Sequence, residues 1–156
     1  MGGGASFNHL NARFTAEDPA GKTPDNAQVL GALRNLMDFI YTFDFVKVRA
    51  DKNFVVSGVP KGVYCRGISQ PVEQFALYHH HSQLDEQFHQ YYIVKAGSYR
   101  ETFVLDLPAG TYRADRIDPA SGSVLGSASF SHQGGNKILN TPEHKVDIAL
   151  RIKRTH

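Results

Sequence analysis

The residues best suited to chemistry in this 156-residue chain are histidines close together in the sequence, with an acidic residue among them: His79, His80, His81, Glu86 and His89. If residues 82–87 form a hairpin loop, His80 and His89 lie opposite each other on neighbouring strands, where two imidazoles can share a metal ion. A closed metal site needs a third or fourth ligand, and Asp85 and Glu86 are the nearest candidates.

The histidine segment is also similar to the first metal motif of cupins, in which His79-x-His81 is followed by Glu86. Pro108-x-Gly110-x-x-Arg113 resembles the second cupin motif. However, Arg113 stands where that motif has its ligand histidine, and Glu73 replaces the glycine that precedes the first histidine. We therefore predict no metal and no cofactor, and we expect partly buried, solvated histidines on neighbouring strands. A metal-binding cupin-like protein that uses the His79–His81 cluster remains an alternative.

Tyrosines are the second candidate group, because an aromatic ring offers an apolar face for stacking and a hydroxyl that can stay in water. We consider Tyr91, Tyr92 and Tyr99 as carbohydrate contacts, which makes a glycan a candidate partner. The chain has seven tyrosines but no tryptophan, and we expect most of the tyrosines to lie in the core or at its edge.

Groups suited to acid–base or nucleophilic catalysis are not paired by their spacing. Asp106, Asp115 and Asp147 fall at strand positions that face outward, which favours solvated carboxylates over catalytic ones. Cys65 is the single cysteine, which excludes an intrachain disulfide and a multi-cysteine zinc site. We therefore predict no catalytic residue and expect that this chain alone is not an enzyme.

The charge and hydropathy of the chain limit its partners. Lysine and arginine exceed aspartate and glutamate by two and are scattered, which argues against nucleic acid. No apolar run approaches the roughly 18–20 residues of a transmembrane helix, so we expect no membrane partner. The chain does not begin with a basic segment followed by an apolar one, so we predict no signal peptide in it.

One amphipathic helix is predicted over residues 23–43, preceded by an extended Gly-rich loop over residues 1–21. Its apolar residues recur every three to four positions and form one stripe: Val29, Leu30, Leu33, Leu36, Met37, Ile40 and Phe43. Thr23 can cap the free amides at the start of the helix, and Pro24 suits the first helical position.

Short β-type runs follow the helix and predict a mainly β fold, an antiparallel β-sandwich of about seven to nine short strands with one N-terminal amphipathic α-helix. The final run alternates most clearly, with one buried face: Val146, Ile148, Leu150 and Ile152. A two-residue loop at Ala109-Gly110 predicts a hairpin that pairs Leu107 with Tyr112. Asp118-Pro119-Ala120-Ser121-Gly122 predicts a turn with glycine at positive φ. Residues 82–92 are expected to form a loop that leads into a strand near Gln90, with a helix as the alternative.

Several segments together resemble the C-terminal part of cellulase-like glycoside hydrolases: Gly3-Gly4-Ala5-Ser6-Phe7-Asn8-His9-Leu10, the end of the predicted helix, residues 105–122 and Asp147-Ile148-Ala149-Leu150-Arg151-Ile152. In that family a (β/α)8 barrel is followed by a small β-sandwich, sometimes labelled a collagen-binding domain. The resemblance implies that residues 1–46 are the last loop and helix of a barrel, with Asn8 and His9 near the barrel mouth. Residues 47–156 would be the sandwich, and the full-length protein would be secreted or periplasmic.

The resemblance implies a non-catalytic accessory domain that supports a catalytic barrel and contacts carbohydrate. The stripe of Leu30, Leu33, Met37 and Ile40 is too apolar to remain in water, so we predict that it packs on the sandwich, on a barrel or on a second copy of the chain. The alternative is one part of a glycan-hydrolysing enzyme whose catalytic carboxylates lie on a missing barrel or a partner chain.

Overall fold

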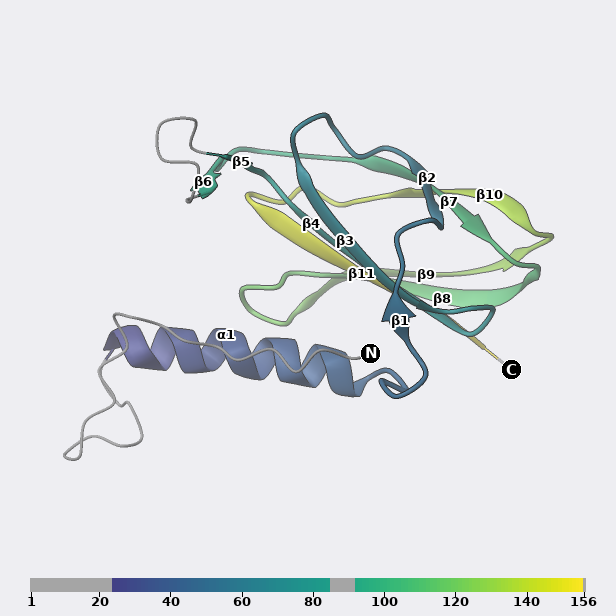
Figure 1. The fold of residues 1–156 in the computed structure, drawn as a ribbon, viewed down its shortest axis with the longest axis horizontal. Helices are drawn as coiled ribbons and strands as arrows, with labels where there is room; N and C mark the ends of the chain where they lie inside the picture. The colour runs from purple at the N-terminus through teal and green to yellow at the C-terminus, as the bar shows by residue number, and fades with distance from the viewer. Residues whose placement is uncertain (1–23, 85–91, 156) are drawn as a thin grey trace.

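Two antiparallel sheets stack face to face and enclose the apolar core (Figure 1). The computed structural model describes residues 24–84 and 92–155. The larger sheet has six strands, in the order β1 (Arg49–Ala50), β3 (Tyr64–Gln70), β4 (Gln74–His80), β11 (Asp147–Arg154), β8 (Gly110–Ile117) and β9 (Val124–His132). The smaller sheet has three, in the order β10 (Gly135–Asn140), β7 (Thr102–Leu107) and β2 (Val55–Ser57). The predicted antiparallel β-sandwich is confirmed.

Alternating residues of the central strands point inward and fill the core. The largest fully buried side chains come from both sheets: Leu77, His79, Phe103, Leu105, Leu107, Tyr112, Ile148, Leu150 and Ile152. The alternation predicted for the final strand is present, because Asp147 and Arg151 are only half-buried between these core residues. His79 stands out in this set, since a buried imidazole normally has hydrogen-bond partners.

β7 and β8 do not form the hairpin predicted around Ala109-Gly110. β7 pairs with β2 and β10, whereas β8 pairs with β9 and β11, so the chain crosses from one sheet to the other after Leu107. Leu107 and Tyr112 therefore enter the core from opposite sheets. The inward alternation of both strands fits either arrangement, so the pattern could not distinguish a hairpin from a crossover.

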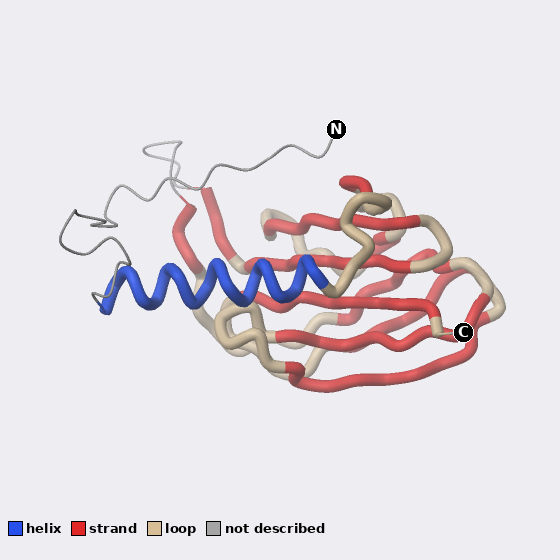
Figure 2. Tube along the Cα trace, turned by 90° about the horizontal axis from the view of Figure 1, so that it is seen from below, coloured by secondary structure: helices blue, strands red, loops and turns tan. Residues whose placement is uncertain are grey.

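The predicted helix is present as α1 (Pro24–Tyr41), which lies across the outer face of the six-stranded sheet (Figure 2). Leu36 and Phe39 line an apolar groove of about 490 Å³ between the helix and the sheet, with Ala149 of β11 on the other wall. Lys153 of β11 donates a hydrogen bond from Nζ to the Thr42 carbonyl at 2.6 Å. A cation at this end of a helix satisfies a free carbonyl and complements the helix dipole.

The turn after β8 holds α1 on the sheet. Asp118 accepts hydrogen bonds from the backbone amide of Ala120 and the hydroxyl of Ser121, and Gly122 has a φ of +72°, as the turn prediction requires. Asn35 of α1 donates from Nδ2 to the Ala120 carbonyl at 2.7 Å. The turn is therefore also the docking point of the helix.

One segment differs locally from its prediction. Residues 82–84 form β5 (Ser82–Leu84), where a loop was expected, and pair with β6 (Tyr92–Val94), which is the strand expected near Gln90. The N-terminal loop and the Thr23 cap lie outside the described residues. Within the described ranges, no helix combines the length and the apolar character needed to cross a membrane.

Candidate functional site

Three histidines and one glutamate from separate chain segments meet at one end of the sandwich. His79 lies on β4, and His81 follows directly after that strand. Glu101 directly precedes β7, and His144 lies shortly before β11, at an isolated bridge with Tyr99. All four residues are buried, with exposed fractions between 0% and 8%. We refer to His79, His81, Glu101 and His144 as the His–Glu cluster.

The Glu101 carboxylate lies in the middle of the His–Glu cluster. Its Oε1 is 2.6 Å from His81 Nε2 and 3.7 Å from His79 Nε2, and its Oε2 is 3.0 Å from His144 Nε2. Thr141 holds this glutamate in place: its Oγ1 accepts the Glu101 backbone amide at 2.9 Å and donates to Oε2 at 3.4 Å. Three ring nitrogens therefore converge on one carboxylate.

Among the described residues, His79 has no hydrogen-bond partner at either ring nitrogen, although it is fully buried. Burial is the main cause that lowers its pKa from 6.5 to about 4, and the nearby Glu101 carboxylate opposes this only in part. The imidazole is therefore neutral near pH 7, with one N–H donor and one bare nitrogen. An unsatisfied buried polar group costs roughly 1–3 kcal/mol, so this histidine requires an explanation.

The tautomer of His144 is fixed by its backbone neighbour. Its Nδ1 lies 3.1 Å from the Pro142 carbonyl, which can only accept, so Nδ1 carries the proton. In the neutral ring, Nε2 then presents a lone pair. This atom approaches the Glu101 Oε2 to 3.0 Å without a hydrogen-bonding alignment. Two acceptors facing each other in a buried site are stable only if a proton or another cation lies between them.

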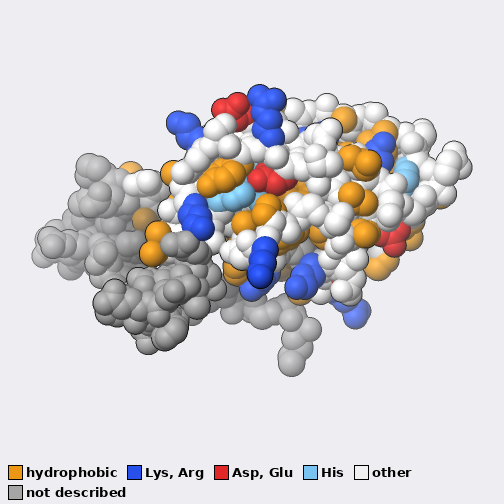
Figure 3. Space-filling model, turned by 90° about the horizontal axis from the view of Figure 1, so that it is seen from above, with side chains coloured by type: hydrophobic (Ala, Val, Ile, Leu, Met, Phe, Trp, Pro, Cys, Tyr) orange, Lys and Arg blue, Asp and Glu red, His pale blue; other side chains and the backbone are white. Residues whose placement is uncertain are grey.

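Tyr99 covers the His–Glu cluster on one side and solvent adjoins it on another. The Tyr99 ring stacks on His81 with centroids 3.4 Å apart and planes 6° from parallel. His81 and Glu101 also line an open depression of about 670 Å³. Seen from above, histidine and carboxylate atoms reach the surface side by side, among hydrophobic and basic side chains (Figure 3).

The structure separates the predicted metal candidates. His79 and His81 enter the cluster and are buried rather than partly solvated. His80 points elsewhere, and its ring centroid lies 6.1 Å from that of Tyr78. Glu86 and His89 lie outside the described residues.

Among the predicted carbohydrate contacts, Tyr99 is the one whose side chain is described. Its ring is covered by His81, and a Cβ added to Gly97 would lie 2.8 Å from its Cζ, so the glycine backbone lies against the hydroxyl end of the ring. A glycan contact at Tyr99 stays a prediction. The other two predicted contacts, Tyr91 and the Tyr92 side chain, lie outside the described part of the chain, as do Asn8 and His9, which were predicted to lie near a barrel mouth.

Glu101 and His144 were not identified from the sequence as site residues, although the strand pattern indicates that Glu101 is buried. Glu101 precedes Phe103 by two residues and Leu105 by four, so the period-two pattern that buries those two also turns Glu101 inward. His144 lies outside a strand and had no such signal.

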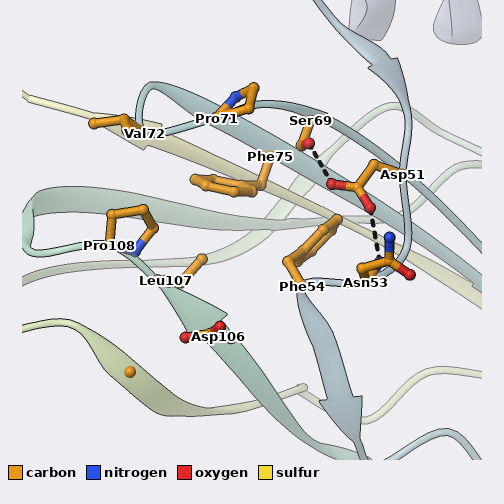
Figure 4. A pocket seen from close by; sticks show the side chains of 11 residues that line it. Asp51, Asn53, Phe54, Ser69, Pro71, Val72, Phe75, Asp106, Leu107 and Pro108 are labelled. Carbon is orange, nitrogen blue, oxygen red and sulfur yellow. Dashed lines mark hydrogen bonds between the residues drawn. The ribbon is translucent and has the colours of Figure 1, made fainter.

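A second depression, of about 400 Å³, lies between the segment before β2 and the end of β7 (Figure 4). Asp51 accepts hydrogen bonds there from the Ser69 hydroxyl at 2.7 Å and from the Asn53 backbone amide at 2.8 Å. Figure 4 shows Asp106 on the far side of the depression from Asp51. The Asp51 carboxylate therefore serves the local fold.

The prediction that Asp115 is a solvated carboxylate is wrong. Asp115 lies on the outer face of the six-stranded sheet but is 4% exposed, because two arginines and a serine cover it. It accepts hydrogen bonds from Arg151 Nη2 at 2.8 Å, Arg113 Nε at 2.9 Å and Ser127 Oγ at 2.6 Å. Burial alone would raise the pKa of Asp115, but these donors and the Arg151 charge lower it from 3.8 to about 2.

Comparison with known proteins gives a likeness of fold. No protein family and no curated protein matches the chain. A glycoside hydrolase of known structure superposes with a TM-score of 0.56 over 88% of this chain and 27% of its own, at 11% identity. A family 5 glycoside hydrolase from Bacteroides vulgatus superposes with a TM-score of 0.55 over 98% of this chain and 29% of its own, at 13% identity. The chain thus spans less than a third of the length of either structure, and it is similar to a part of these glycoside hydrolases in fold.

Proposed function

We propose that this chain is a non-catalytic β-sandwich domain of a glycoside hydrolase-like protein and that it supports a catalytic barrel. The observation that carries the proposal is the position of α1, which contacts the sandwich on one side and leaves a second apolar side exposed. In both glycoside hydrolases of similar fold, more than two thirds of the chain lies outside the matched part, so a larger body accompanies this fold there.

The two sides of α1 follow from its geometry. Asn35, Leu36 and Phe39 line the groove that faces the sandwich, although Leu36 at its rim is still 54% exposed. At about 100° per residue, Leu30 and Met37 fall roughly 150–175° around the helix from the centre of that contact. They are 39% and 42% exposed, although both belong to the predicted apolar stripe. Covering such side chains stabilises an assembly by about 25 cal/mol per Å² of apolar surface.

The sequence favours a barrel as the partner that covers the exposed side of α1. The resemblance to cellulase-like glycoside hydrolases implies that α1 is the last helix of a barrel. In a (β/α)8 barrel the helices form an outer ring that packs on the strands, which is where an apolar stripe is buried. The half-buried Leu33 and Ile40 of α1 would extend the same contact.

Three of the acidic groups among the described residues support a non-catalytic role. Asp51, Glu101 and Asp115 are each held by hydrogen bonds to neighbouring groups. The catalytic carboxylates of the proposed protein would therefore lie on the barrel. The second candidate, in which this chain completes an active site, would require a residue of this chain to contact the substrate.

Two measurements test the proposal. The purified chain is incubated with a panel of aryl glycosides and polysaccharides, and we expect no hydrolysis; turnover by this chain alone would contradict a non-catalytic role. The coding sequence next to this chain is then read for a (β/α)8 barrel, in the same frame or in the adjoining gene. We expect one, and its absence would count against the accessory role.

A further inference from the structure

The His–Glu cluster has no role in the proposed function, and its buried, unpartnered His79 needs an explanation. We propose that His79, His81, Glu101 and His144 bind one divalent transition-metal ion, and zinc is the ion to test. The ion would tie the end of β4 to the segments before β7 and β11. This inference does not depend on a glycoside hydrolase role.

The donor set suits such an ion. Imidazole nitrogen and carboxylate oxygen are ordinary zinc ligands, and structural zinc sites have four protein ligands in a tetrahedron. His79, His81 and Glu101 each offer a ligand atom, and these atoms lie within 4.8 Å of one another. Bonds of about 2.0–2.1 Å give a tetrahedral edge of about 3.3 Å. The distances from Glu101 Oε1 to His81 Nε2 and His79 Nε2, 2.6 and 3.7 Å, lie on either side of that length, and His144 Nε2 approaches the other carboxylate oxygen, Oε2, at 3.0 Å.

The proton positions leave lone pairs that point at the carboxylate. His144 Nε2 is a bare nitrogen in the neutral ring, because Nδ1 donates to Pro142. Neither ring nitrogen of the buried His79 makes a hydrogen bond to a described residue, so either nitrogen is available as a ligand atom. A cation among these atoms would replace acceptor–acceptor contacts with ligand bonds. The proton that His81 shares with Glu101 would leave to solvent on binding, since a ligating imidazole is neutral.

The surroundings of the cluster resemble the outer shell of a metal site. Histidine ligands commonly donate their second ring nitrogen to a backbone carbonyl, and ligating carboxylates are themselves hydrogen-bonded. His144 has such a bond to Pro142, and Glu101 has one from the Thr141 hydroxyl. The Tyr99 ring stacked on His81 fixes the plane of that imidazole. The open depression at His81 and Glu101 provides a path for the ion.

A metal-free hydrogen-bond network is the competing explanation. In that arrangement His81 donates to Glu101 at 2.6 Å, and a hydrogen shared between His144 Nε2 and Oε2 bridges their 3.0 Å separation. It leaves both nitrogens of the buried His79 without a partner in the described part of the chain. The metal site accounts for His79 as well, which is why we prefer it.

Metal binding is tested on the chain without a histidine tag, after treatment with a chelator. Zinc chloride is titrated by calorimetry, and the melting temperature is measured with and without zinc. We expect one zinc per chain and a higher melting temperature in its presence, because a ligand that binds the native state stabilises it. X-ray absorption of the zinc-loaded protein should show about four nitrogen or oxygen neighbours at about 2.0–2.1 Å, with imidazole scattering.

Variants distinguish this site from other histidines. His144→Gln and Glu101→Gln should each weaken zinc binding by at least about tenfold. His80→Gln is the matched control, since it changes an adjacent histidine that points away from the cluster, and it should bind zinc like the unmodified chain. If Glu101→Gln does not fold, the zinc affinity of His144→Gln still tests the proposed site. No zinc binding to the folded chain, or equal losses in His80→Gln and His144→Gln, would overturn the proposal.

Discussion

Replacing Asp115 with asparagine tests the ion-pair network on the outer face of the larger sheet. The variant keeps the shape of the side chain and removes its charge, which leaves Arg151, with its side chain 19% exposed, without its ionic partner. A carboxyl pKa held at about 2 instead of 3.8 corresponds to about 2 kcal/mol of stability near pH 7. Removing one partner of a fully buried ion pair costs about 3–5 kcal/mol. The smaller loss expected for Asp115→Asn agrees with the partial exposure of the arginines that pair with Asp115.

The lowered pKa of Asp115 determines the direction in which the stability difference changes with pH. The folded-state pKa of Asp115 is lowered, so its contribution is present above the unfolded-state pKa near 4 and is lost as the pH falls toward 2. The difference in unfolding free energy between the unmodified chain and Asp115→Asn should therefore be about 2 kcal/mol at pH 7 and pH 5. It should shrink steadily between pH 4 and pH 2.

Urea denaturation followed by circular dichroism at several pH values measures this difference. Asp106→Asn is the matched control, because Asp106 is an exposed aspartate on β7. We expect its effect to stay within about 0.5 kcal/mol at neutral pH, as for surface substitutions in general. A pH-independent difference for Asp115→Asn, or an equal loss in Asp106→Asn, would refute the assignment of stability to this network.

Three further substitutions and one reactivity test follow from the backbone and from burial. Val72 has a φ of +77° in the turn between β3 and β4, where a β-branched residue is strained. Val72→Gly should therefore raise the unfolding free energy by about 0.5–1 kcal/mol. A lower unfolding free energy would contradict strain at this position. At Gly58, with φ of +100°, an added Cβ would collide with the Thr102 carbonyl oxygen, so Gly58→Ala should lower the unfolding free energy by about 3 kcal/mol or more. Gly31→Ala on α1 is its control, because no described heavy atom lies within 4 Å and alanine should raise helix stability by up to about 1 kcal/mol. Burial raises the pKa of the Cys65 thiol, so iodoacetamide should alkylate it more slowly in the folded chain than in urea, and equal rates would show that the thiol is accessible.

The secondary structure could be read from the sequence more fully than the pairing of the strands. The final strand alternates in the sequence and in the structure because one face meets the core. The turn from Asp118 to Gly122 has the side-chain acceptor and the positive φ that its residues predict. The β7–β8 connection was misassigned, because inward alternation says which residues are buried and not which strand accepts their hydrogen bonds.

The candidate site could be predicted only in part, for a related reason. His79 and His81 continue the inward pattern of Phe75 and Leu77, yet their solvation was predicted from residue type alone. The distance along the chain from His81 to His144 is 63 residues, so no local spacing could join them. Their meeting depends on β11 pairing with β4, which is a property of the sheet order.

If the exposed side of α1 supports a barrel, this chain should bind the barrel encoded beside it. The barrel, produced as a separate chain, is titrated calorimetrically with the unmodified chain, with Met37→Glu and with Ile138→Glu, a control at an exposed apolar position on β10. We expect a one-to-one complex. Met37→Glu should weaken its affinity at least about tenfold, since burying a methionine contributes about 1.5–3 kcal/mol. Ile138→Glu should leave the affinity unchanged. No binding, equal effects of the two substitutions, or a dimer of this chain that Met37→Glu disrupts would show that the exposed side of α1 does not serve a barrel.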